Sequence, residues 1–253
     1  MPPRAAPALG DPRRKAYRRH VPIRDELIQR TIQQIANLLA RLVTGRAGHD
    51  ITAAELREAE QELDELYLAN LGSSRALIHR LGTEDLLGVL RTSGTVHAER
   101  AYVLGALLAT EGAVVATHHG ADDPQALSLR ESALDILLEA GAARVGEPDL
   151  RERVDDLVRH APPAGWPAAR FERLFRFEHA MGAFARAETA LFTWLERVEG
   201  MQARLEVADA ANAFYDELLT LEDADLAKGD FSRDEVHEGR ADLAERFAEL
   251  LGG

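Results

Sequence analysis

The residues best suited to chemistry in this chain are two adjacent histidines flanked by acidic residues. His118 and His119 are followed by Asp122 and Asp123, and Glu111 lies two helical turns before His118. Imidazole nitrogens and carboxylate oxygens are ligands for iron, manganese or zinc. Neighbouring side chains on a helix point about 100° apart, so both histidines face one ion only if the helix has already ended. The simpler alternative is that these polar residues end one helix and that Asp123 caps the next.

Other kinds of catalytic site have little support in the sequence. The chain holds no cysteine, which excludes thiolate chemistry, disulfides and cysteine-based metal sites. The glycines at 141 and 146 have neither a Walker lysine nor a preceding strand, and no serine lies in a G-x-S-x-G elbow. We therefore assign no catalytic residue, no metal ligand and no cofactor. A metal-dependent enzyme built on His118, His119, Asp122 and Asp123 is kept as an alternative function.

Charge is distributed unevenly along the chain. Residues 1–20 hold six basic residues and one acidic residue, which gives this stretch a net charge of +5. Because the formal net charge of the whole chain is −13, the remaining residues carry a net charge of −18. Four prolines and no hydrophobic periodicity in this stretch predict a disordered basic tail over residues 1–21. An acidic body disfavours binding of nucleic acid, but the tail could attract phosphates. A nucleic-acid-associated protein tethered by residues 1–20 is a second alternative.

Composition points to a soluble protein. The chain has 253 residues, of which 46% are apolar, enough for a sizeable core. No apolar run approaches the ~18 residues that span a bilayer, and the N-terminus has charge without the apolar segment of a secretory signal. The absence of cysteine fits a reducing compartment. We expect a cytoplasmic protein with no membrane contact.

Hydrophobic periodicity predicts helices in nearly every segment from residue 22 onward. A helix is expected from Ile23 to near Gly45, and another opens with the capping box Thr52-x-x-Glu55 and ends at Gly72. Three further helix starts are expected at Thr83, Asp123-Pro124 and Ser232-x-x-Glu235. We find no convincing strand. The predicted fold class is all-α, a single unit over 22–253, with an N-terminal helical subdomain at 22–91.

Two stretches within residues 95–253 repeat the spacing of a tetratricopeptide-type (TPR-like) helical hairpin, in which small residues let two helices approach closely. The matching positions are Leu104-Gly105, Gly112, Ala126 and Ala133 in the first, and Gly182, Phe184, Ala187 and Leu191 in the second. The predicted architecture is a stack of antiparallel helical hairpins, α-solenoid-like, with capping helices at its C-terminal end. Phe175 stands where the motif usually has a small residue, so regular superhelical stacking is not assured.

The order of these segments resembles an uncharacterised family of bacterial all-helical proteins with TPR-like helix pairs. The resemblance covers about residues 22–250 and rests on three groups of residues: Ile23 to Ile28 with Ile32 and Ile35, Ala187-Glu188-x-x-Leu191-Phe192, and Phe214-Tyr215-x-x-Leu218 with Leu226, Gly229, Arg233 and Gly239. It implies the all-helical fold and no assigned activity.

The function expected from this architecture is a scaffold or adaptor that binds another protein. In the TPR-like register, four residues would line the inner face of the hairpins and contact the partner: Tyr102, Glu172, Arg176 and His179. A clamp for a peptide's terminal carboxylate is not expected, because its basic and amide positions hold Tyr102 and Ala106. Helical repeat surfaces also self-associate, so a homodimer is a further possibility.

Overall fold

The protein is all-α, as the sequence predicts. The computed structural model describes residues 30–31, 33–35, 37–38, 52–143, 148–161 and 163–252. The predicted basic tail and most of the helix expected from Ile23 to Gly45 lie outside these residues, although the described residues between 30 and 38 are helical. The elements are α2 (Ala53–Leu71), α3 (Arg75–Ile78), α4 (Thr83–Leu90), β1 (Arg91–Thr92), β2 (Thr95–Val96), α5 (Ala98–His119), α6 (Pro124–Ala143), α7 (Pro148–His160), α8 (Ala168–Ala180), α9 (Phe184–Arg197), α10 (Met201–Thr220), α11 (Asp223–Lys228) and α12 (Arg233–Gly252).

Local capping explains several helix starts. Thr52 and Glu55 form the predicted capping box, in which the Glu55 carboxylate accepts the Thr52 backbone N–H at 2.8 Å. The Asp123 carboxylate accepts the backbone N–H groups of Gln125 and Ala126 at 2.9 and 3.1 Å and so opens α6. The prediction for α4 was wrong by one residue, because Thr83 is already helical and Gly82 is the N-cap.

A short hairpin contradicts the expectation that the chain has no strand. β1 and β2 pair antiparallel, with Arg91 opposite Val96 and Thr92 opposite Thr95. The two turn residues, Ser93 and Gly94, both have positive φ, 53° and 82°, which is the backbone of a tight hairpin turn. Strands of two residues are too short to show a period in the sequence.

The predicted small residues do bring α5 and α6 together. A Cβ placed on Gly105 would lie 2.6 Å from the Leu137 Cγ, and one on Gly112 would lie 3.2 Å from the Ala126 carbonyl oxygen. Side chains at these positions would push the two helices apart. Gly182 has another role, because it turns the chain between α8 and α9 with φ of +69° and has open space around it.

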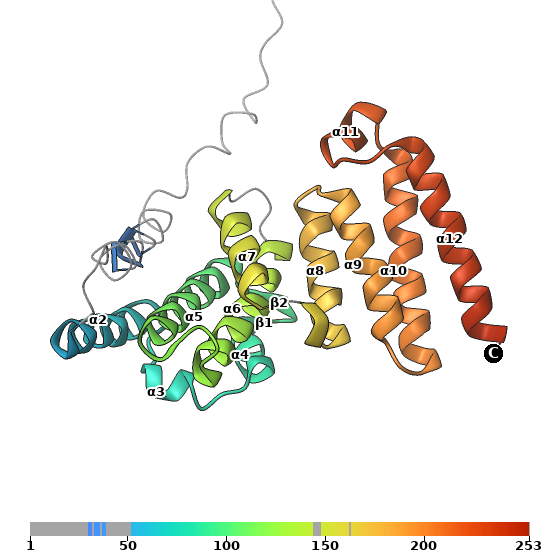
Figure 1. Cartoon of the computed structure of the whole chain (residues 1–253). Coiled ribbons are helices and arrows are strands. Elements are labelled where there is room, and N and C mark those ends of the chain that lie inside the picture. The colour runs from blue at the N-terminus through green and yellow to red at the C-terminus, as the bar shows by residue number, and fades with distance from the viewer. Residues whose placement is uncertain are drawn as a thin grey trace, which may run out of the picture.

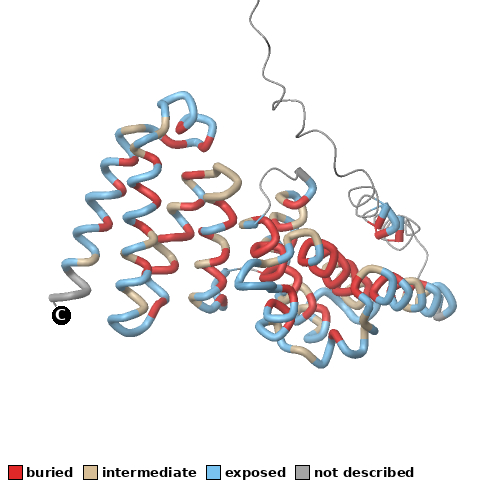
Figure 2. The backbone as a smooth tube through the Cα atoms, turned by 180° about the vertical axis from the view of Figure 1, so that it is seen from behind, coloured by how far each residue is buried: buried red, intermediate tan, exposed pale blue. Residues whose placement is uncertain are grey.

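The helices form two differently oriented groups. In Figure 1, α8, α9, α10 and α12 stand side by side in a row, while the axes of α2 and α5 lie across the axes of those four helices. Buried residues are most concentrated in α5 and α6, as Figure 2 shows. The row is attached to the rest of the molecule mainly where α8 packs on α6.

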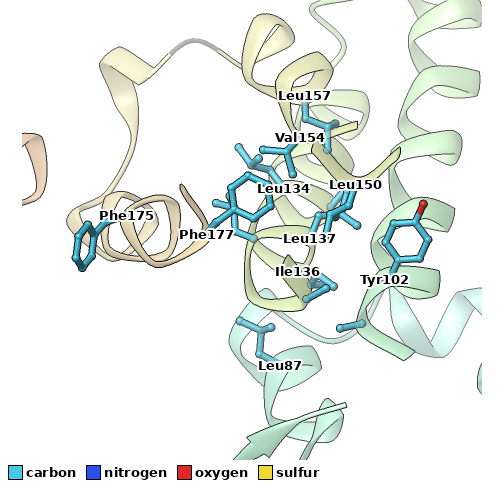
Figure 3. Close-up of a cluster of buried hydrophobic side chains, with 14 of the residues drawn as sticks. Leu87, Tyr102, Leu134, Ile136, Leu137, Leu150, Val154, Leu157, Phe175 and Phe177 are labelled. Atoms are coloured by element: carbon cyan, nitrogen blue, oxygen red, sulfur yellow. The ribbon is translucent and has the colours of Figure 1, made fainter. Parts of the chain in front are cut away.

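Two phenylalanines of α8 point to opposite sides of the helix and pack against different neighbours. Phe177 points towards α6 and α7, beside Leu134 and Leu150, whereas Phe175 points away from them (Figure 3). On that other side the Phe175 ring meets the Phe214 ring edge-on, with centroids 5.5 Å apart. α8 therefore lies between two aromatic and aliphatic clusters of one continuous core.

One helix in the described part of the chain is long and apolar enough to cross a membrane. This helix is α5, and 67% of its most apolar 18-residue stretch is buried inside the protein. Burial of that kind is what a core helix requires.

Candidate functional site

The structure separates the four predicted partner-contact residues. Glu172, Arg176 and His179 lie on α8 at the i, i+4 and i+7 positions of one face, but Tyr102 lies in α5 and is only 3% exposed. Arg176 Nη1 is 3.3 Å from Glu139 Oε1 of α6, and His179 Nε2 is 3.3 Å from Glu217 Oε2 of α10. The face on α8 thus exists as an ion-paired surface, and Tyr102 belongs to the core. Contact of these residues with a partner stays a prediction.

The predicted metal candidates are only partly brought together. His118, His119 and Glu111 line one cavity of about 310 Å³, whereas Asp122 and Asp123 do not line it. The two imidazole rings stack with centroids 4.9 Å apart. Within the described residues, no three histidine, aspartate or glutamate side chains converge as metal ligands would. Asp123 serves as the cap of α6.

Glu111 is the centre of this cavity, which lies between α2, α3 and α5. Its carboxylate is 3% exposed; Oε2 accepts a hydrogen bond from the Tyr67 hydroxyl at 3.0 Å and lies 2.9 Å from His79 Nε2. Arg75 lies 3.5 Å from Oε1 and also pairs with Asp64 at 2.9 Å. Burial raises the pKa of the Tyr67 phenol far above its ordinary value, and the nearby Glu111 charge raises it further. The raised pKa favours the protonated phenol, which donates to Glu111.

A second hollow is an apolar groove of about 390 Å³ between α7, α8 and α9. We call it the groove; its lining is Val158, Pro163, Ala164, Phe171, Leu174, Glu178, Arg186, Thr189, Ala190, Thr193 and Arg197. Several polar atoms among these residues have partners inside the protein. Thr189 and Thr193 donate to helix carbonyls at 3.0 and 2.8 Å, and Arg197 donates to the Ala164 carbonyl at 3.3 Å.

Glu178 lies at the groove with its carboxylate held by two arginines. Arg151 Nη1 and Arg186 Nη2 each lie 2.8 Å from one of its oxygens, and Arg186 also reaches Asp155 at 2.5 Å. Burial raises the pKa of the Glu178 carboxyl above its ordinary value, and the two guanidinium groups oppose that rise. The remaining lining groups leave the exposed surface of the groove apolar.

A buried ion-pair network between α6 and α8 was not predicted. Arg170 of α8 donates from Nε and Nη2 to the two oxygens of Asp135 of α6, both at 2.9 Å, and Arg173 Nε lies 3.5 Å from Glu139 Oε1. The signal was present, since Asp135 and Glu139 interrupt a run of apolar residues from Leu134 to Ala140. Buried carboxylates require a cation or several donors, so they indicated an internal partner.

Comparison with known proteins gives a family and no activity. No curated protein matches the chain, and no solved structure matches it. One family model matches residues 23–248, nearly the whole stretch for which a helical body is expected, and its description assigns no function. That agrees with the resemblance to an uncharacterised family. The chain belongs to the family of unknown function DUF6483.

Proposed function

We propose that the protein is a helical scaffold that binds another polypeptide, and that the binding surface is the groove between α7, α8 and α9. The observation that supports this is the chemistry of the groove. Its lining includes apolar side chains such as Phe171, Leu174 and Ala190, and the Thr189 and Thr193 hydroxyls already donate to carbonyls within the protein. An occupant therefore gains most by placing apolar side chains there.

A polar small molecule fits the groove less well than a polypeptide does. A sugar or nucleotide requires several convergent donors and acceptors for orientation. The Thr189 and Thr193 hydroxyl hydrogens and one guanidinium nitrogen of Arg186 are already bound to neighbouring groups. Grooves between helices are common docking sites for an amphipathic helix, which needs mainly apolar anchors.

The groove also suits a partner better than the predicted face on α8. On that face Arg176 and His179 already have ion-pair partners, so a ligand there would have to compete with Glu139 and Glu217. Exposed ion pairs contribute about 0–1 kcal/mol each, whereas burial of apolar area drives association. The TPR-like hairpin order expected from the sequence is compatible with either surface.

Site-specific photo-crosslinking tests the proposal. A photoreactive phenylalanine analogue placed at Thr193, in the groove, should capture a polypeptide in the native cells. The same analogue at Thr220, an exposed threonine outside the groove, is the matched control and should capture far less. Thr193→Trp should fill the groove and abolish capture by a second reporter placed at Thr189. Equal capture at 193 and 220, or none at 193, would contradict the proposal.

A further inference from the structure

We propose that the occupant of the groove is the first part of α10 from a second copy of the same chain, so that the protein assembles with itself. This inference rests on the proposed function, because it names the polypeptide that binds the groove. It is carried by three side chains on α10: Met201, Leu205 and Asp209.

The first observation is an exposed apolar pair. Met201 is 48% exposed and Leu205 is 44% exposed, and their i, i+4 spacing puts both on one stripe of α10. The other large apolar side chains that are exposed in the described part of the chain are Leu68, Leu77 and Val89, which lie on three different helices. Met201 and Leu205 thus have the spacing of anchors that a helix inserts into an apolar groove.

The second observation is a matching pair of charges. Asp209 continues the same stripe one turn after Leu205, is exposed, and has no cationic side chain within ion-pair distance among the described residues. Arg197 ends the lining of the groove; it donates to the Ala164 carbonyl and lies over the Phe171 ring, and no carboxylate of the described residues pairs with it. The stripe on α10 therefore presents two apolar side chains followed by Asp209, and the groove presents an apolar lining that ends at Arg197, so the two surfaces are complementary.

Charge also selects among the possible occupants. The basic tail of the same chain, with a net +5 over residues 1–20, would bring arginines against Arg186 and Arg197. The stripe on α10 brings a carboxylate to Arg197 instead. Because each copy carries both a groove and an α10, two copies can bury both apolar surfaces at once, as self-complementary dimers do.

Sedimentation of the purified full-length chain over a concentration series is the first test. We expect a dimer or larger assembly that dissociates on dilution. Leu205→Asp should weaken association at least about tenfold, because it places a charge on the apolar floor. Leu77→Asp, at a leucine that is 49% exposed on α3, is the matched control and should associate like the wild type. Circular dichroism must show equal helicity in both variants.

A charge swap tests the predicted register. Arg197→Asp and Asp209→Arg should each weaken association about threefold to tenfold, and the double variant should recover most of the loss. A monomer at every concentration, or a Leu205→Asp variant that associates normally, would overturn the inference. If the reporter at 193 captures only foreign proteins, the proposed function holds and this inference fails; if it captures nothing, both fail.

Discussion

Two hollows in the described part of this molecule have similar volumes and opposite surfaces. The groove, at about 390 Å³, and the cavity between α2, α3 and α5, at about 310 Å³, each lie over a buried carboxylate. Glu111 in the cavity is bound by a tyrosine, a histidine and an arginine that themselves line or border it. Glu178 at the groove is bound by arginines, and the surface left to solvent is apolar.

The difference separates a structural site from the proposed binding site. Polar groups that bond to one another beside the cavity join α2, α3 and α5, so we expect this polar network to stabilise the fold. The apolar surface that the groove leaves exposed gains free energy when something covers it. We therefore expect changes in the cavity to lower stability without affecting association, and changes in the groove to do the reverse.

The largest effect should come from Glu111→Ala. It removes the acceptor of the buried Tyr67 hydroxyl and the partner of His79, at a cost of about 3 kcal/mol in the free energy of unfolding. Denaturant titration measures this. Glu60→Ala, at a partly buried residue that lines the same cavity, should cost less than about 0.5 kcal/mol. Comparable losses in the two variants would mean that the network around Glu111 does not stabilise the fold.

A smaller loss is expected from Gly105→Ala. The new methyl group would lie 2.6 Å from Leu137 Cγ and would force α5 away from α6, at a cost of about 2 kcal/mol. Gly88→Ala is the matched control, because Gly88 lies in α4 with no atom within 4 Å of the added Cβ. That variant should gain about 0.4–1 kcal/mol through helix propensity. Thermal unfolding of the two variants measures both changes in stability. A change of the same sign in both variants would contradict the close packing of α5 on α6.

The smallest effect should be a pH dependence that distinguishes two tyrosine–carboxylate pairs. Tyr215 donates to Glu188 at 2.6 Å, as Tyr67 donates to Glu111, but among the described residues no cation pairs with Glu188. Burial raises the pKa of Glu188 above its ordinary value of 4.5; the Tyr215 hydrogen bond lowers it, and the charges of Glu235 and Asp242 raise it again.

The sign follows from linkage between protonation and folding. A group whose pKa is higher in the folded state stabilises the fold below its unfolded pKa, and this stabilisation disappears as pH rises through the folded value. Glu188→Gln keeps an acceptor for Tyr215 without a charge, so its stability should fall less than that of the wild type as pH rises from 4.5. Unfolding titrations across that range test it, and parallel pH profiles would show that Glu188 does not contribute.

Features of the fold that depend on a few neighbouring residues were predictable from the sequence. Caps at Thr52 and Asp123 act within one helical turn, and the spacing of Gly105 and Gly112 gave the close pairing of α5 with α6. The β-hairpin was missed because each strand has two residues and only the turn at Ser93 and Gly94 distinguishes it from a loop.

The sites were less predictable because their residues are far apart in the sequence. Tyr67 and His79 reach Glu111 across 44 and 32 positions, and no local pattern links them. The groove is still harder to predict from the sequence, because its lining combines residues of α7, α8 and α9 and its apolar members are ordinary core residue types. Helical periodicity can place apolar residues on a helix face, but it does not show that a hollow remains between three helices.

The ion pairs between α6 and α8 bear on how this chain can be divided. Asp135 and Glu139 lie on α6, outside the row, and the arginines that neutralise them, Arg170 and Arg173, lie on α8 within the row. A fragment cut before α8 would keep two buried acids with their main counter-ions removed, and the excised row would keep two stranded guanidinium groups. Neither piece should be recoverable as an autonomous fragment, and a gene fusion that transplants the row alone should yield insoluble protein.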